Sequence, residues 1–180
     1  MSVKADIAKA EIDEAISQYL SVRLRFFEVA AKYPNYLAGN DNVIGRIGEY
    51  LGMIYLESQG RKVQKVSSPT EKGHDLKEGS VRISVKILTS ENVLGRGLRL
   101  TEPWDELVLI ELDTKSLIYR VGTLQKIEFE LAISENSGWS RNPYVKKTML
   151  GAKGLIGRYG RISAPIAFPR GIPSSVGNQS

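Results

Sequence analysis

The sequence predicts an α/β protein in which a mixed central β-sheet of about five strands is flanked by helices. Three observations predict this class. Two segments near the start of the chain carry the 3.6-residue apolar period of amphipathic helices. Several short segments that are alternating or continuously apolar follow them, as expected of strands. A further helical segment comes after the last of these strands.

The first helical segment covers residues 5–33. Its apolar residues fall loosely on one stripe, namely Ile12, Ile16, Tyr19, Leu20, Phe26, Phe27 and Ala30. The pattern fits one long helix or two helices with a break, and Pro34 ends it. A second helix is expected to begin at Asp41 or Asn42, which are good N-caps, and to end at Gly60.

Five strands are expected in the middle of the chain, at residues 62–66, 74–76, 81–87, 106–112 and 117–121. The third of them alternates strictly between apolar and polar residues, and Glu78-Gly79 is expected to form the hairpin turn before it. The fourth is more continuously apolar, which indicates a strand covered on both faces. A turn at residues 113–115 leads into the last strand.

The end of the chain is expected to contain one more helix and then little regular structure. Thr123 is expected to cap the helix, which runs to about residue 133. The chain therefore divides into an N-terminal helical segment (1–40), an α/β core (41–134) and a basic C-terminal extension (135–180), all within one domain.

Composition excludes several kinds of functional site. The 180 residues include no cysteine, which excludes disulfides, zinc–thiolate sites and cysteine nucleophiles. The single histidine, His74, excludes sites that need two imidazoles. A bound metal would have to be held by oxygen atoms, which suits Mg²⁺, Mn²⁺ or Ca²⁺. The polar start predicts no signal or transit peptide, and no apolar run approaches the ~20 residues of a membrane span, so a cytoplasmic location is expected.

Charge is unevenly distributed along the chain. Residues 136–180 hold seven basic residues and no acidic one, which leaves 18 basic and 20 acidic residues in the rest. A basic segment on a nearly neutral body suggests a polyanionic partner. A solvated basic tail is the alternative.

The second helix carries a stripe of small residues that includes one acid. Gly45, Gly48 and Gly52 are spaced by three and four, and Glu49 lies within the same stripe. Such a stripe lets a helix approach a sheet or a ligand closely, and Glu49 would then point inward. The alternative is tight helix–sheet packing with Glu49 at the rim.

The hairpin at residues 74–87 is expected to gather polar residues on one face. With the turn at Glu78-Gly79, Asp75 would lie opposite Arg82, and Ser84 and Lys86 would share its face. A lysine in the middle of a strand is costly unless it is solvated or paired with a carboxylate, which Asp75 or Glu49 could supply. An exposed edge strand is the alternative.

This group of residues suits metal-assisted hydrolysis of a phosphodiester. Asp75, a second carboxylate and a backbone carbonyl would hold Mg²⁺, which polarises the phosphate and generates hydroxide. Lys86 would orient or deprotonate the attacking water.

The motif GHDLKEGSVRISVK (73–86), preceded by the helix GRIGEYLG (45–52), resembles the PD-(D/E)xK nuclease superfamily, whose fold is restriction-endonuclease-like. The resemblance covers roughly residues 43–121. It implies that Asp75 is a metal ligand, that Lys86 is catalytic and that Glu49 is an added helix carboxylate. It also implies that the Val85 carbonyl faces the metal, which is Mg²⁺ or Mn²⁺.

Two positions depart from the family pattern. His74 stands where the motif has proline, and either lies beside Asp75 as a supporting group or is simply packed. Ser84 stands where the motif has a second acid. Some members of the superfamily have Ser-Val-Lys here and supply the carboxylate from elsewhere, for which Glu49 is the first candidate and Glu91 the second. The alternative is a degenerate site on a fold that only binds nucleic acid.

Basic residues outside the motif are candidates for contacts with nucleic acid. Two lie in the segment after the third strand and six in the C-terminal segment, where aromatics alternate with cations: Arg96, Arg99, Arg141, Lys146, Lys147, Lys153, Arg158 and Arg161. The sequence thus predicts a Mg²⁺-dependent nuclease acting on DNA, with RNA as a second substrate to test. The rival hypotheses are a non-catalytic nucleic-acid-binding module and an interaction domain whose long N-terminal helix mediates assembly, for example as a homodimer.

Overall fold

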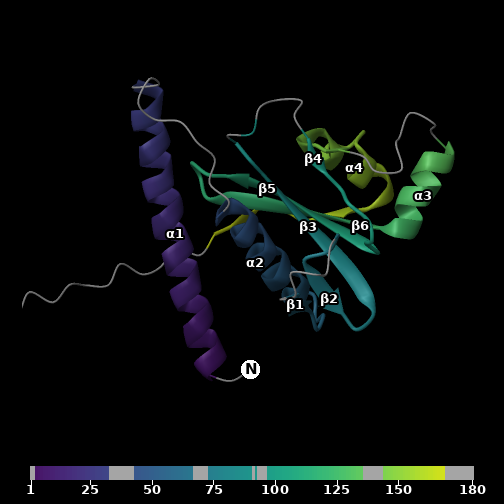
Figure 1. The fold of residues 1–180 in the computed structure, drawn as a ribbon, viewed down its shortest axis with the longest axis horizontal. Coiled ribbons are helices and arrows are strands. Elements are labelled where there is room, and N and C mark those ends of the chain that lie inside the picture. The colour runs from purple at the N-terminus through teal and green to yellow at the C-terminus, as the bar shows by residue number, and fades with distance from the viewer. Residues whose placement is uncertain are drawn as a thin grey trace, which may run out of the picture.

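The computed structural model describes residues 3–32, 43–66, 73–90, 92, 97–135 and 144–168. These residues form an α/β fold built on a mixed sheet (Figure 1). Within the described ranges, no helix combines the length and the apolar character that crossing a bilayer requires.

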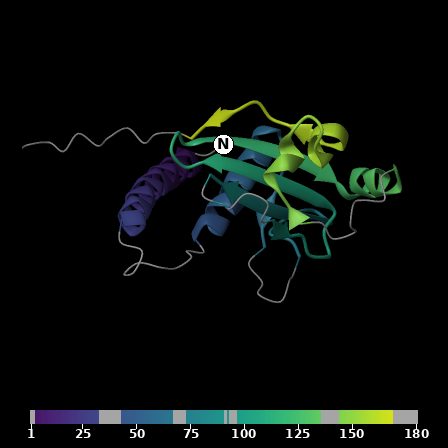
Figure 2. The ribbon, with the colours of Figure 1, turned by 90° about the horizontal axis from the view of Figure 1, so that it is seen from above.

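The first half of the chain begins with two helices. Helix α1 (Val3–Lys32) is a single helix of 30 residues, without the break that the sequence left open. Helix α2 (Val43–Ser58) ends two residues before Gly60, whose φ of 80° suits a glycine after a helix. In both views α1 lies at one end of the molecule and helix α3 (Lys126–Glu135) at the other (Figures 1 and 2).

The main sheet contains all five expected strands and two more. Its strands are β1 (Gln64–Lys65), β2 (Leu76–Glu78), β3 (Val81–Thr89), β5 (Glu106–Asp113), β6 (Ile118–Gln125), β8 (Arg161–Ile162) and β9 (Ile166–Ala167). The spatial order is β1-β2-β3-β5-β6-β8, and β9 also pairs with β6. Only β3 and β5 run parallel, so the sheet is mixed as predicted.

The expected start of the third helix was wrong. Thr123 lies inside β6, opposite Val108, and helix α3 (Lys126–Glu135) begins three residues later. The β5–β6 ladder continues from Asp113↔Ile118 to Glu106↔Gln125, so its backbone hydrogen bonds hold Thr123 in a strand despite its capping preference.

Much of the expected C-terminal extension is part of the fold. Residues 144–168 form β7 (Tyr144–Val145), a 3₁₀ helix η1 (Lys147–Leu150), helix α4 (Leu155–Tyr159), β8 and β9. Strand β7 pairs with β4 (Leu98–Arg99) in a separate two-stranded sheet. The segment buries six apolar side chains: Val145, Met149, Leu150, Leu155, Ile156 and Phe168.

The two faces of the main sheet are covered by different parts of the chain. Helix α2 packs on one face, where Gly48 lies against Ile87 and Gly52 against Val85. On the other face Leu107 and Leu109 pack in one cluster with residues of the C-terminal segment, including Val145 and Ile156. Strand β3 is therefore covered on both sides.

Candidate active site

Asp75 immediately precedes β2 and is held by β3. Its N–H donates to the carbonyl oxygen of Ile83 at 2.9 Å. Its carboxylate Oδ2 accepts the N–H of Val85 at 2.7 Å. A side chain thus takes the place of a backbone acceptor where the β2–β3 ladder stops, and this fixes the carboxylate beside the edge of β3.

The expected register of the hairpin was wrong by two residues. The ladder pairs Lys77 with Arg82 and Glu78 with Val81, so the turn is Gly79-Ser80 and not Glu78-Gly79. Gly79 has a φ of 58°, which glycine adopts without strain. Continued by one residue, this register places Asp75 opposite Ser84 instead of opposite Arg82. Asp75 is thereby shifted along the strand toward Lys86. The error is an even number of residues, so the alternation of faces is unchanged.

Lys86 is the cation that faces Asp75. Its Nζ lies 3.8 Å from Asp75 Oδ2, and both side chains are about three-quarters buried, with exposures of 22% and 27%. The distance is that of an ion pair and exceeds normal hydrogen-bond length. The structure therefore brings together the acid and the lysine that the motif singled out.

The surroundings of Asp75 disfavour its charge. Burial raises the pKa of Asp75, and the nearby charge of Glu49 raises it further. Lys86, the Val85 N–H and His74 act in the opposite direction but do not offset the burial. A largely buried carboxylate with a raised pKa beside a lysine is a recognised physical signature of a functional site.

Glu49 approaches this group from α2. Its Oε2 pairs with Lys65 Nζ at 2.8 Å, and 24% of the Glu49 side chain is exposed. Helix α2 covers the face of the sheet that carries Val85, whereas Lys86 projects toward the opposite face. Glu49 thus influences Asp75 electrostatically while its own salt bridge is to Lys65.

Lys65 was not among the residues predicted for the site. It lies on β1 opposite Leu76, the residue that directly follows Asp75 in the chain. The only sequence signal was the alternation of residues 62–66, which marks a strand and says nothing about which carboxylate the lysine meets.

Ser84 does not lie on a polar surface, as was expected of its face. It is fully buried, and in the described part of the protein its Oγ has no hydrogen-bond partner. Its neighbour across the ladder is Leu107, so it lies within an apolar layer. The expectation failed because β3 is a central strand, and central strands alternate between two covered faces.

The other predicted residues fall into three groups, the last of which is the set of basic residues on folded elements. Glu91, Arg96 and Arg141 lie outside the described residues, and nothing follows about them. His74 is buried next to Asp75, and Val85 is the residue whose N–H Asp75 binds.

The remaining basic residues are carried on folded elements. Arg99 lies on β4 opposite Tyr144 of β7, and the others lie on or beside β7, η1, α4 and β8: Lys146, Lys147, Lys153, Arg158 and Arg161. Arg158 also covers the ring of Tyr159 at 5.2 Å. β4, β7, η1 and α4 contribute to the same buried cluster as Leu109, the ladder neighbour of Lys86. They therefore lie on the side of the sheet toward which Lys86 projects.

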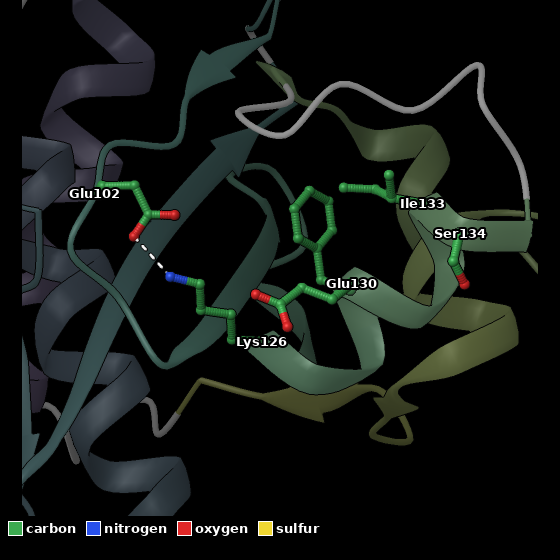
Figure 3. A pocket seen from close by; sticks show the side chains of 6 residues that line it. Glu102, Lys126, Glu130, Ile133 and Ser134 are labelled. Atoms are coloured by element: carbon green, nitrogen blue, oxygen red, sulfur yellow. Dashed lines mark hydrogen bonds and ion pairs between the residues drawn. The ribbon is translucent and has the colours of Figure 1, made fainter.

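A pocket against α3 is separate from this group. It has a volume of about 640 Å³ and lies against α3 (Figure 3), lined by Glu102, Lys126, Phe129, Glu130, Ile133 and Ser134. Glu102 and Lys126 form an ion pair at 3.0 Å across its side. None of the residues that the motif singled out contributes to it.

The donor set around Asp75 is compatible with a hard divalent cation. Among the described residues there is no group of three or more histidines and acids that could hold a metal. Asp75 has one further carboxylate in its surroundings, Glu49, whose charge raises the pKa of Asp75. Mg²⁺ commonly takes one or two protein carboxylates and completes its shell with water and substrate phosphate, so these residues fit such a site.

Comparisons with known proteins add no relative. The chain matches no protein-family model, no curated protein sequence and no solved structure.

Proposed function

We propose that the protein is a Mg²⁺-dependent nuclease of restriction-endonuclease-like fold that hydrolyses phosphodiester bonds, with DNA as its main substrate. The observation that carries the proposal is the Asp75–Lys86 pair, in which a largely buried acid with a raised pKa lies 3.8 Å from a lysine. The order of helix acid, hairpin acid and strand lysine along the chain also agrees with the motif.

Asp75, Glu49 and the backbone carbonyl of Val85 are the groups that would hold Mg²⁺ or Mn²⁺. Such an ion, when bound, polarises a phosphate oxygen and lowers the pKa of a bound water. The Val85 N–H keeps the Asp75 carboxylate in one orientation, so little reorganisation is needed on binding. Glu49 would have to exchange its salt bridge with Lys65 for the metal.

Lys86 has the position and the chemistry to act on the attacking water. Its stem is buried beside Leu109, and its ammonium group lies next to Asp75. There it can donate a hydrogen bond to a water or to a non-bridging phosphate oxygen and offset negative charge as it develops. His74, beside Asp75, contributes to the electrostatics but has no assigned proton-transfer step.

The basic residues on the Lys86 side of the sheet would contact the nucleic-acid backbone. In residues 144–168 there are five basic residues and no acidic one. Phosphate contacts of this kind position the substrate without reading its sequence.

The test is cleavage of labelled DNA and RNA by the full chain with and without Mg²⁺. Cleavage should require the metal and should fall by about 100-fold or more in Lys86→Ala, a typical loss for a group that assists proton transfer. Lys62→Ala, a change of the same kind at an exposed lysine, is the matched control and should cleave normally. Metal-independent cleavage, or equal activity of the two variants, would contradict the proposal.

A second function is favoured by one observation, the neutral and buried Ser84. A site with one acid fewer than the motif is expected to hold a metal weakly, and the fold would then act as a nucleic-acid-binding module without catalysis. Salt-dependent DNA binding, together with the absence of any Mg²⁺ affinity that depends on Asp75, would select this function.

A further inference from the structure

Helix α1 has an inner face that is fixed to the rest of the protein. Leu20 is fully buried on it, and Ile16 packs against the same core. Lys9 forms a salt bridge with Glu57 of α2 at 2.8 Å, and the Tyr50 hydroxyl donates to Asp13 at 2.9 Å. These contacts fix the rotation of α1, and therefore fix which residues face away from the protein.

The exposed side of α1 carries several large apolar side chains. Four of the eight large hydrophobic side chains exposed in the described part of the protein lie on this helix: Ile7, Ile12, Val22 and Phe26, which are 42% to 69% exposed. In Figures 1 and 2 the helix stands at the edge of the fold. A cluster of exposed large apolar groups on one helix marks an interaction surface more often than chance.

The spacing of this outer face is that of a coiled coil. Seven small or apolar residues recur at alternating steps of four and three, and we call them the α1 seam: Ala8, Ile12, Ala15, Tyr19, Val22, Phe26 and Val29. Five of them are exposed and Val29 is half-buried, whereas Tyr19, in the middle of the seam, packs partly against the core of the protein. The seam runs for three heptads, or about 30 Å of helix. A period of 3.5 residues keeps a seam facing one partner helix along its whole length.

The charges along α1 favour one kind of partner. Among the described side chains of α1, the exposed charged residues of the first half are acidic, Asp6 and Glu11. Those of the second half are two basic residues, Arg25 and Lys32, and one acidic residue, Glu28. A second α1 that runs in the opposite direction would place acidic half against basic half at both ends. A parallel arrangement would place like charges together.

Two charged residues beside the α1 seam also favour an antiparallel partner. Glu11 and Arg25 each precede a seam residue, Ile12 and Phe26, on the exposed side of the helix. When Ile12 of one copy faces Val22 of the other, Glu11 and Arg25 of opposite copies lie on the same side, twice by symmetry. Arg25 is 71% exposed and contacts only its own helix neighbour Glu28, at 3.3 Å, among the described ion pairs.

We propose that α1 is a dimerisation helix, and that its seam packs against the seam of a second copy running antiparallel. The interface is self-complementary, as a two-fold dimer requires. The inference is independent of the proposed nuclease activity.

The first experiment measures the mass of the full chain by sedimentation velocity over a wide concentration series. The wild type should dimerise, and Val22→Glu/Phe26→Glu should be monomeric with an unchanged circular dichroism spectrum. Ile127→Glu/Leu131→Glu is the matched control, because it charges two equally exposed hydrophobic residues on α3, and it should remain dimeric. A wild type that stays monomeric, or a seam variant that still dimerises, overturns the proposal.

The second experiment tests the orientation and uses the absence of native cysteine. Ile12→Cys and Val22→Cys are prepared as separate proteins and oxidised alone and as a mixture. An antiparallel seam gives a disulfide-linked dimer only in the mixture. Efficient cross-linking of each variant with itself indicates a parallel pair and overturns the antiparallel arrangement.

A charge reversal supplies an independent check. Glu11→Arg alone and Arg25→Glu alone should each weaken dimerisation by about tenfold, since each turns two attractive pairs into repulsive ones. The double variant should recover the wild-type dissociation constant. Failure of the double variant to recover, with both single variants weakened, would overturn the pairing of Glu11 with Arg25.

Discussion

Strand β3 carries two acid–base pairs that differ in geometry and in electrostatics. At its start, the Arg82 guanidinium binds both carboxylate oxygens of Asp105 at 2.8 Å, and the Arg82 N–H donates to the same carboxylate. These bonds lower the pKa of Asp105 to about 2. Farther along, Lys86 contacts Asp75 through one oxygen at 3.8 Å, and burial raises the pKa of that acid.

The difference separates a structural pair from a candidate functional one. The Asp105 carboxylate has its charge fully compensated, which stabilises the fold and leaves little capacity for a further ligand. Asp75 is held in place by a backbone N–H but remains poorly compensated for its burial. An added cation would stabilise Asp75 and would do little for Asp105, so a metal is expected to discriminate between the two sites.

The largest expected effect is on catalysis. Asp75→Asn keeps an oxygen that can accept the Val85 N–H but removes the charge, so cleavage should fall by about 100-fold or more while the melting temperature is unchanged or rises. Asp105→Asn should do the reverse, keeping activity within a few-fold and lowering the melting temperature. Cleavage rates and thermal unfolding of both variants test this, and a parallel loss of both properties in Asp75→Asn would count against a functional role.

The next effect concerns the helix that brings Glu49 toward Asp75. A Cβ at Gly48 would lie 2.7 Å from the Cβ of Ile87, so Gly48→Leu should force α2 away from β3 and destabilise the fold by about 1–3 kcal/mol. Gly45→Ala is the control, since a Cβ there meets nothing within 4 Å, and it should stabilise by up to about 1 kcal/mol. Urea unfolding measures both, and equal effects would show that the close approach is unimportant.

Ser84→Ala should have a smaller effect. Because the Ser84 Oγ is buried without a hydrogen-bond partner among the described residues, its removal should change the free energy of unfolding by less than about 1 kcal/mol. Cleavage should also keep the Mg²⁺ dependence of the wild type if the two carboxylates suffice. A need for much more Mg²⁺ in Ser84→Ala would instead identify the hydroxyl as a ligand.

The smallest effect is on the acid side of the stability profile. The pKa of Asp105 is lowered in the folded state from 3.8 to about 2, so its pair with Arg82 contributes fully above the higher value and is lost as the pH falls toward the lower one. Between these two pH values, Asp105→Asn should therefore lose less stability than the wild type. Thermal unfolding at a series of acid pH values tests the difference, and an unchanged slope would mean that other carboxylates dominate it.

Local patterns predicted the parts of the fold that depend on near neighbours. The strict alternation around Ile83 and Val85 predicted β3, and the hairpin motif predicted that Asp75 and Lys86 would meet. The hairpin register was missed because the turn residues Glu78, Gly79 and Ser80 allow two neighbouring positions for the turn, and only the packed ladder selects one.

Contacts between distant segments were beyond local patterns. Lys65 meets Glu49 through the arrangement of β1 against α2, which no spacing encodes. Ser84 is buried because other segments cover β3, including residues around Val145. The regular structure of residues 144–168 depends on the close packing of Leu150 and Ile156 against Gly122. The sequence of this segment has little periodicity and does not reveal that contact.

Strands β8 and β9 pair with the same edge of β6, through Gly122↔Ile162 and Tyr119↔Ile166. During synthesis the ribosome completes β6 about 40 residues before it completes β8 and β9, which pair with this edge. Until then the nascent chain presents an unpaired edge of a largely apolar strand. An unpaired edge of this kind templates aggregation. Shortening the chain to residue 135 would make that exposure permanent, and the expected outcome is an insoluble product.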